Sequence, residues 1–233
     1  MEISKIKIER AAAPVRKVVE KGLREAIIRG DLAPGAHLVD RELCSMFDVS
    51  RTVVREAQRS LEAEGLVEII PHRGVFVRRI SYDEAQQIYD VRKVLEALAG
   101  QKCAMNATET DIAELEAVCE QLRASIDSPQ DVDLLAIKTR FYDVLMRAAH
   151  NRMVEKMLGQ ILNYNTQLRA TSLSEPGRLP RTVEELDRIV DAIRAHDSAG
   201  AWDACFTHVE NAARAALRVL KEQNERDEAA RRK

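Results

Sequence analysis

The hydrophobic period of the sequence changes between residues 40 and 79, and this change restricts the fold more than any other feature. Two short segments with helical spacing are separated by the turn FDVS. The stretch LVEIIPHRGVFVRRI then alternates like two strands around a Pro-His-Arg-Gly tip. The expected elements are helices over 14–29, 40–46 and 51–64 and strands over 66–70 and 75–79. This order predicts a winged helix-turn-helix, with three helices and a two-stranded wing.

Polar residues stand where two of these helices should begin. Short side-chain oxygens accept hydrogen bonds from the free amides of a first helical turn. We therefore expect Asp40 to cap the helix over 40–46 and Ser50 to cap the helix over 51–64.

The rest of the chain has helical spacing throughout. Ser81 with Glu84, and Thr108 with Asp111, have the three-residue separation of a capping box. The expected helices cover about 81–104, 108–126, 131–149, 151–172, 182–198 and 200–222. The second half is thus predicted to be an all-α bundle of about six helices.

Charge is divided unevenly between the two halves. Residues 1–80 carry 15 Lys and Arg against 12 Asp and Glu, whereas residues 81–233 carry 21 against 26. We expect a mainly α protein with two domains, 1–80 and 81–233. The basic excess is weak evidence by itself, because binding of nucleic acid depends on where the charges cluster.

The composition argues against several classes of protein. No run approaches the roughly 18 apolar residues of a membrane span, and the start MEISKIKIER lacks the uninterrupted apolar region of a signal peptide. The cysteines Cys44, Cys103, Cys119 and Cys205 are dispersed, which argues against a zinc ribbon or a secreted disulfide framework. With 45% hydrophobic and 32% charged residues, a cytoplasmic protein with reduced thiols is expected.

The helix over 51–64 gathers basic residues on one side, next to an apolar packing arc. At about 100° per residue, the residues that share this basic arc are Arg51, Thr52, Arg55 and Arg59. The first residues of the second helix in a helix-turn-helix reach base edges in the major groove, where arginine can hydrogen-bond guanine. Alternatively, the arc is only solvated, with Arg55 and Arg59 paired to Glu56, Glu62 or earlier acids.

The motifs LAPG, RELC, VSRTVVREA, LEAEGLV and PHRG occur in this order, and the segment that contains them resembles the DNA-binding domain of the GntR family of bacterial transcription factors. The second half, opening with YDVRKVLEALAG, resembles the FCD effector domain of the FadR-type subfamily. The resemblance implies a homodimer on palindromic operator DNA. Together with their neighbours on the basic arc, the residues expected to contact DNA are Arg41, Ser50, Arg51, Thr52, Arg55, Arg59, His72, Arg73 and Gly74.

The resemblance also implies a metal site that this sequence does not reproduce. Many FCD domains hold a divalent metal through an Asp and a His four residues apart and a His on each of two later helices. Aligned by FYDVLMRAAHN and EELDRIVDAIRAHD, these positions are Lys138, Tyr142, Leu186 and His208. An amine, a phenol and one imidazole do not suit a hard metal or zinc, so no metal is expected. A shifted alignment remains an alternative because other ligand types lie nearby, namely Asp131, Asp133, Asp187 and His196.

The replacements predict a different kind of pocket. Lys138 lies on an inner helical stripe with Phe141, and a buried cation needs a partner. We expect a small metabolite with a carboxylate or phosphate group to be held, without metal, by Arg92, Lys138, Tyr142 and His208. Alternatively, an internal pair such as Arg92 with Glu96, or a lysine that reaches solvent, satisfies these charges.

The expected function is a ligand-responsive transcriptional regulator, more often a repressor in this family. An enzyme is the alternative from another class, with Lys138 and Tyr142 four residues apart as its only candidate pair. No phosphate loop, nucleophile and base, or carboxylate dyad accompanies this pair, so we expect no enzyme. A regulator with a closed pocket that responds to a partner protein stays open.

Overall fold

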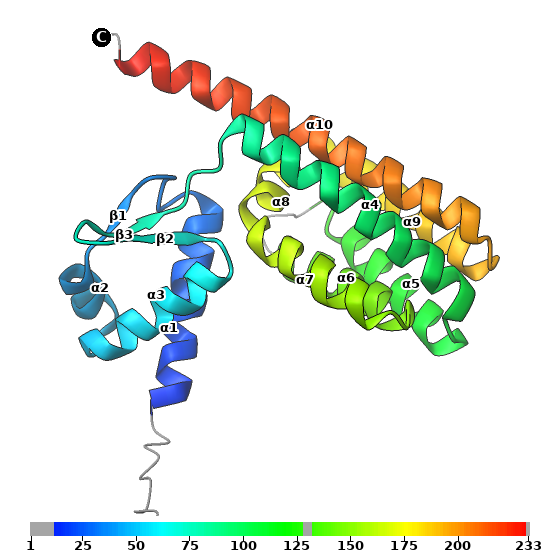
Figure 1. Cartoon of the computed structure of the whole chain (residues 1–233), viewed down its shortest axis with the longest axis horizontal. Helices are drawn as coiled ribbons and strands as arrows, with labels where there is room; N and C mark the ends of the chain where they lie inside the picture. Colours follow the sequence, from blue (N-terminus) through cyan, green and yellow to red (C-terminus); the bar gives the residue numbers. More distant parts are fainter. Residues whose placement is uncertain (1–11, 128–131, 232–233) are drawn as a thin grey trace, which may run out of the picture. The chain divides into compact units, whose positions relative to one another are not determined.

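The chain divides into two compact units between Arg79 and Ile80. The computed structural model describes residues 12–127 and 132–231. Each unit has its own hydrophobic core, so each is described by itself, and Figure 1 gives the labels of its helices and strands.

The first unit has the predicted winged helix-turn-helix architecture. Its elements are α1 (Ala12–Arg29), β1 (His37–Leu38), α2 (Asp40–Phe47), α3 (Arg51–Ala63), β2 (Val67–Ile70) and β3 (Gly74–Val77). The sheet has three strands in the order β1-β3-β2, all antiparallel, and not only the two predicted strands of the wing. The sequence analysis missed β1 because two residues are too few to show an alternating pattern.

The core of this unit fixes which side of α3 faces inward. Val54, Ala57 and Leu61 are fully buried on α3 and belong to a cluster with Leu23 of α1 and Leu66 before β2. The basic arc of α3 is therefore left on the outside, as its periodicity predicts.

One predicted helix cap is wrong and the others are confirmed. Asp40 is the first residue of α2 and not its cap, since Val39 holds that position without a side-chain hydrogen bond. The Asp40 carboxylate instead accepts hydrogen bonds from Arg55 Nε at 2.9 Å and from Gln58 Nε2 at 3.2 Å. Arg55 and Gln58 on α3 therefore draw the carboxylate away from the amides of its own helix. Ser50 accepts a hydrogen bond from the amide of Val53 at the start of α3, as predicted.

The second unit is all-helical, as predicted. Its helices are α4 (Tyr82–Asn106), α5 (Glu109–Ala124), α6 (Leu134–Ala148), α7 (Arg152–Tyr164), α8 (Thr166–Leu173), α9 (Arg178–Arg194) and α10 (Ser198–Arg231). The segment expected as one helix over 151–172 is divided at Asn165, whose φ of −102° and ψ of 22° depart from the helical region. The side chains of Ser81 and Thr108 cap α4 and α5 as predicted, and Thr108 forms a full capping box with Asp111.

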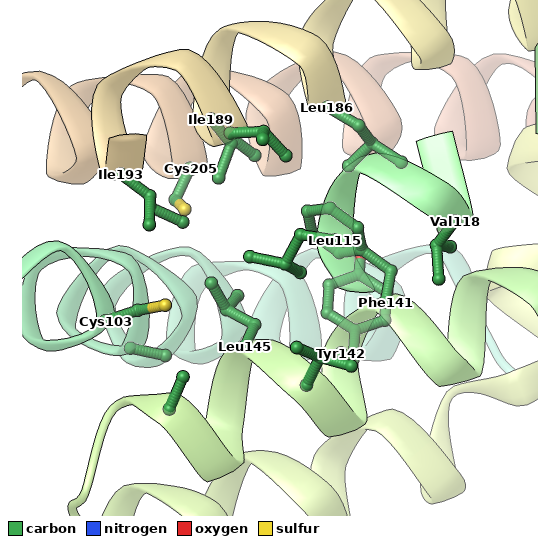
Figure 2. Close-up of a cluster of buried hydrophobic side chains, with 14 of the residues drawn as sticks. Cys103, Leu115, Val118, Phe141, Tyr142, Leu145, Leu186, Ile189, Ile193 and Cys205 are labelled. Atoms are coloured by element: carbon green, nitrogen blue, oxygen red, sulfur yellow. The ribbon is translucent and has the colours of Figure 1, made fainter. Parts of the chain in front are cut away.

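Apolar side chains from six of the described helices, α4 to α7, α9 and α10, fill the centre of this unit. Figure 2 shows Leu115 and Val118 from α5 facing Phe141 and Leu145 from α6, with Leu186 from α9 closing the cluster. The cysteine side chains at this level, on α4 and α10, are free thiols. The bundle is thus a packed core in which a polar group needs a partner of its own.

The helices α4 and α10 run side by side over much of their length (Figure 1). Gly100 permits their close contact, because a Cβ there would overlap Cys205 Sγ and lie 3.0 Å from the carbonyl oxygen of Ala201. The sequence thus places a glycine at a point of close contact between the two helices.

None of the helices in the described part of the chain has the length and apolar content that a membrane crossing requires.

Candidate functional site

The outer side of α3 presents the predicted basic residues to solvent. Arg51, Thr52, Arg55 and Arg59 are all exposed, and so is Ser50, which caps the helix. The first turn of α3 therefore offers guanidinium, hydroxyl and backbone donors on one surface, without burying any of these side chains.

Among the residues that the structure describes, one arginine of the expected contact set, Arg55, is paired as the alternative interpretation requires. Arg55 Nε lies 2.9 Å from Asp40 Oδ2, while 66% of the Arg55 side chain stays exposed. Across residues 12–127 and 132–231, no ion pair involves Arg41, Arg51 or Arg59. The pair with Asp40 uses the Nε of Arg55 and leaves its terminal nitrogens available as donors.

The backbone of the wing tip makes a tight turn in which two residues have positive φ angles. His72 and Gly74 have positive φ angles of 62° and 108°. A Cβ at Gly74 would lie 2.5 Å from His37 Nε2, so the position excludes larger residues. His72 is exposed, and the exposed Arg73 guanidinium lies 5.9 Å from the centre of the Phe76 ring. The tip thus presents an imidazole and a guanidinium on a rigid turn.

The structure brings the four predicted effector residues into one buried group in the second unit. Arg92 of α4 donates from Nη2 to the Tyr142 hydroxyl at 2.7 Å. That hydroxyl lies 3.1 Å from His208 Nε2 of α10. Lys138 lies one helical turn before Tyr142 on α6 and is only 2% exposed. Arg92 also donates from Nε to Glu96 at 3.0 Å, the internal pair that the sequence offered as an alternative.

Three further residues complete this group. Glu185 of α9 accepts from His208 Nδ1 at 2.7 Å and from Asn211 Nδ2 at 2.7 Å. Arg178 donates two hydrogen bonds to the same carboxylate, at 3.0 and 2.7 Å. A continuous chain of hydrogen bonds therefore runs from α4 through α6 and α10 to α9.

The protonation of this chain follows from its surroundings. Burial would raise the pKa of Glu185, but the hydrogen bonds from His208 and Arg178 and the positive charge of Arg178 lower it to about 2. Burial lowers the pKa of His208 despite the hydrogen bond to Glu185, so the imidazole is neutral. Its proton then lies on Nδ1, facing the carboxylate, and Nε2 accepts from the Tyr142 hydroxyl.

Positive charge exceeds negative charge in this buried group. The basic side chains are Arg92, Lys138, Arg169 and Arg178, and the carboxylates are Glu96 and Glu185. Arg169 stacks over Tyr142 at 5.3 Å and donates to Thr139, but its Nε has no hydrogen-bond partner in the described structure. In the same residues, no hydrogen bond or ion pair reaches Lys138. Burial and the neighbouring arginines hold the pKa of Lys138 well below its usual value.

The residues present do not fit the divalent metal that the family resemblance implies. Both nitrogens of His208 are engaged, by Tyr142 and Glu185, and an amine stands at position 138. Leu186 is fully buried in the apolar core and supplies no donor atom. Among the residues that the structure describes, no three His, Cys, Asp or Glu side chains gather as a metal-binding group.

A surface pocket of about 240 Å³ adjoins the buried group between α9 and α10. Arg178, Glu185 and Asn211 line it, so residues of the hydrogen-bonded group around His208 also face this pocket. Arg188 and Arg214 line it too. The pocket offers a small molecule a basic surface one side chain away from His208.

Sequence reasoning missed Arg169, Arg178, Glu185 and Asn211. Arg178 and Glu185 are seven residues apart and therefore share one face of a helix, a signal that could have been read once α9 was extended to begin at Arg178. Asn211 lies three residues after His208 on α10 and could have been found in the same way. No signal in the sequence points to Arg169, because its position depends on the break at Asn165.

Comparison with known proteins agrees with both units. The model of the bacterial regulatory proteins of the gntR family matches residues 15–77, and the FCD domain model matches residues 87–211. The chain is 26% identical to the galactonate operon transcriptional repressor of Escherichia coli, over 82% of this chain and 92% of that protein. It is also 26% identical to the E. coli transcriptional repressor RspR, over 91% and 93%.

Solved structures show the same fold. E. coli McbR/YncC superposes with a TM-score of 0.69 at 21% identity, covering 90% of this chain and 98% of that one. A GntR regulator from Rhodococcus sp. RHA1 superposes with a TM-score of 0.69 at 24% identity, covering 87% and 97%. The chain belongs to the GntR family of bacterial transcriptional regulators and carries an FCD domain after its DNA-binding unit.

Proposed function

We propose that this regulator is a repressor that binds a palindromic operator as a homodimer and is controlled by a small anionic metabolite. Two relatives over most of the chain are repressors by name. In this proposal the first unit reads the DNA and the second unit binds the metabolite and mediates dimerisation. Cells would then carry the protein in the cytoplasm, where its operator is.

The proposed DNA surface combines the first turn of α3, the start of α2 and the wing tip. Arg51 and Thr52 stand at the exposed start of α3, where major-groove contacts are made. Arg41 at the start of α2 would meet the phosphate backbone, and His72 and Arg73 would approach the neighbouring groove from the wing. Arg55 reaches the same side while Asp40 limits its rotation.

The excess of buried positive charge carries the effector proposal. Burying a charged group without a partner costs several kcal/mol, and such groups lose their charge or find a counter-ion. In the described part of the chain, Lys138 lies near three arginines and has no acceptor, and Arg169 Nε has no hydrogen-bond partner. A carboxylate or phosphate group would supply the missing acceptors. Arg92, Tyr142 and His208 would then orient the rest of the ligand.

Effector control follows from the position of these groups. The hydrogen-bonded chain links α4, α6, α9 and α10, so a ligand that binds Lys138 and His208 acts on four helices at once. A ligand shifts a conformational equilibrium by as much as its affinities for the two states differ. This difference in affinity would determine whether the ligand makes the proposed repressor bind or release its operator.

We infer no catalytic role for Lys138 and Tyr142. No hydrogen bond joins them in the described residues, and the Tyr142 hydroxyl is engaged by Arg92 and His208. Burial raises the pKa of Tyr142 above its usual value, which makes the phenol a poorer acid. The relatives named above are transcriptional repressors by name.

The DNA half of the proposal is tested by a gel shift with DNA from beside the gene for this protein. We expect tight binding to a palindromic sequence that weakens steeply with salt, because phosphate contacts release counter-ions. Equal affinity for the palindrome and for bulk DNA would contradict the proposal.

The effector half is tested by thermal unfolding with a panel of carboxylic acids and phosphate esters, with and without EDTA. A ligand that binds only the folded state raises the midpoint by an amount that grows with the logarithm of its concentration above Kd. We expect a rise for at least one anion, unaffected by EDTA and lost in Lys138→Met. The control is Lys156→Met, which removes an exposed lysine of α7.

Two results would contradict this half. Sensitivity to EDTA would restore the metal site of the family. The second is that no anion raises the midpoint and Lys138→Met stabilises the protein. The buried lysine would then only destabilise the fold, and a regulator with a closed pocket that responds to a protein partner would be the better account.

A further inference from the structure

The surface pocket between α9 and α10 is lined by more positive than negative side chains. Among the residues that the structure describes, its lining includes five arginines, namely Arg178, Arg181, Arg188, Arg214 and Arg218. Three carboxylates stand against them, from Glu175, Glu184 and Glu185. The lining therefore has an excess of two positive charges around a space of about 240 Å³. A cleft lined mainly by one sign of charge concentrates ions of the opposite sign.

Helical spacing brings these side chains to one surface. Arg181 and Arg188 are seven residues apart on α9, and Arg214 and Arg218 are four residues apart on α10. Residues at these separations lie on the same side of a helix. Because α9 and α10 pack against each other (Figure 1), the two basic sides meet at the pocket.

Two of the five arginines have no carboxylate partner. Arg181 and Arg218 are both paired with Glu175, at 3.4 and 2.7 Å. Across residues 12–127 and 132–231, by contrast, no ion pair involves Arg188 or Arg214. Both side chains are exposed, and they come from different helices. They can therefore bind one ligand from two sides.

The lining also includes an arginine that is almost completely buried. Arg178 is 2% exposed, and its two terminal nitrogens donate to Glu185. Its Nε has no hydrogen-bond partner in the described structure. A buried donor without an acceptor is destabilising, and an oxyanion in this pocket would supply the acceptor without displacing Glu185. This donor distinguishes the pocket from a patch of solvated arginines.

We propose that this pocket is a second ligand site, which binds a phosphoryl group, either as free phosphate or on a small phosphate ester. Near pH 7 a phosphoryl group carries close to two negative charges on one compact centre, which matches the excess charge of the lining. A guanidinium binds such a group through two parallel N–H donors. The pocket is smaller than the roughly 300 to 1,000 Å³ of a drug-sized ligand site, so the ligand is a small one.

This inference goes beyond the proposed function, whose effector binds Lys138 inside the bundle. Glu185 connects the two sites, because it accepts from Arg178 at the pocket and from His208 Nδ1 at 2.7 Å in the buried group. Phosphate bound at Arg178 would therefore act on His208 without entering the buried group. Ligands at two sites that share such a connection change each other's affinity by the same factor.

The test is titration of the full chain with inorganic phosphate by isothermal titration calorimetry, at constant ionic strength. A titration with sodium chloride measures the non-specific effect of salt. We expect one phosphate per chain. Arg188→Gln combined with Arg214→Gln should raise Kd at least about 10-fold, because the two changes remove charge-assisted hydrogen bonds. The control Arg152→Gln removes an exposed arginine of α7 and should leave Kd unchanged.

Glu184→Gln should change the affinity in the opposite direction. This exposed carboxylate lines the pocket, and its charge repels an anion there. Its removal should lower Kd for phosphate about 2- to 5-fold, the size of effect that exposed charges have. Damage to the fold would not strengthen binding, so an unchanged or higher Kd would overturn the inference.

Two further ligands identify the chemistry of the site. Glycerol 3-phosphate should bind with the same dependence on Arg188 and Arg214. A lower Kd for glycerol 3-phosphate would assign the site to an ester, and a lower Kd for inorganic phosphate would assign it to the free ion. Citrate has carboxylates only, and citrate binding at these arginines more tightly than either phosphate would overturn the phosphoryl class.

Lys138→Met separates this inference from the proposed function. We expect it to leave phosphate binding unchanged, because Lys138 belongs to the buried group. Binding that is lost in Lys138→Met and kept in the double arginine variant would overturn the second site and would support the proposed effector site. A wild type that shows no phosphate binding beyond the effect of sodium chloride would overturn the second site alone.

Discussion

His208 Nδ1 lies 2.7 Å from Glu185 Oε2, and this hydrogen bond determines which nitrogen of the imidazole carries its proton. The other nitrogen then accepts from Tyr142. The bond also places a carboxylate between two donors with different charges, a neutral imidazole and the guanidinium of Arg178. Disturbing Glu185 therefore leaves more than one group without a partner.

Glu185→Gln should lower the free energy of unfolding by about 3 to 5 kcal/mol, the usual effect of removing one partner of a buried ion pair. The amide cannot accept both hydrogen bonds from Arg178 and also those from His208 and Asn211. Urea unfolding at neutral pH measures the loss. Glu184→Gln, at an exposed neighbouring position, is the control and should change the free energy by less than about 0.5 kcal/mol.

Acid should weaken the second unit through this same carboxylate. The pKa of Glu185 is lowered to about 2 in the folded protein, from a usual value of 4.5. Its contribution to stability is therefore complete above about pH 4.5 and is lost as the pH falls toward 2. The shift corresponds to about 3 kcal/mol. Subtracting the pH profile of Glu185→Gln from that of the wild type should isolate this loss, and a flat difference would contradict the assignment.

Protonation of His208 should also lower the free energy of unfolding, at a higher pH than protonation of Glu185 does. Because burial lowers its pKa in the folded protein, the unfolded chain takes up a proton first as the pH falls below about 6.5. Wild-type stability should therefore decline on acidification below that value, and His208→Asn should decline less. Equal slopes for the two proteins between pH 7 and 5 would show that folding does not shift the pKa of His208.

Tyr142→Phe should cost about 1 to 3 kcal/mol, the usual penalty for leaving buried groups without a hydrogen-bond partner. The change removes the hydroxyl shared by Arg92 and His208 and keeps the ring over which Arg92 and Arg169 stack. Thermal or urea unfolding measures the difference. Tyr82→Phe, at the start of α4 where the side chain is only half-buried, should have a much smaller effect.

Arg51→Ala should weaken operator binding about 5- to 150-fold if the arginine makes a base contact, since such a contact contributes about 1 to 3 kcal/mol. The loss should be larger for the operator than for bulk DNA. Arg152→Ala, at an exposed position of α7, should leave binding unchanged. Titration of labelled DNA by fluorescence anisotropy measures both. A uniform loss across sequences would instead assign Arg51 to the phosphate backbone.

Periodicity and helix-capping residues made most of the fold predictable. The inward side of α3 follows from the spacing of Val54, Ala57 and Leu61, and Thr108 with Asp111 identifies the start of α5. The role of Asp40 could not be read in this way, because its competing partners Arg55 and Gln58 are brought to it only by the fold. The strand β1 is visible only through its pairing with β3.

The buried polar group was predictable only in part. Lys138, Tyr142 and His208 stand at positions that the resemblance to FCD domains implies for a metal, and Arg92 and Lys138 fall on apolar stripes. Glu185 and Arg178 lie on α9, whose start was placed four residues too late, so their common face was not considered. Arg169 depends on the change of direction at Asn165, where no proline or glycine announces a break.

The contact at Gly100 has a mechanical consequence. Because Gly100 of α4 lies against the Cys205 side chain and the Ala201 carbonyl oxygen of α10, the two helices have little room to slide and should move together. Arg92 lies on α4 and His208 lies on α10. Both are hydrogen-bonded to the Tyr142 hydroxyl, so a displacement of either residue also affects the hydrogen bond of the other. Gly100→Ala would push α4 and α10 apart, and the distance between Arg92 and His208 would be the first to change.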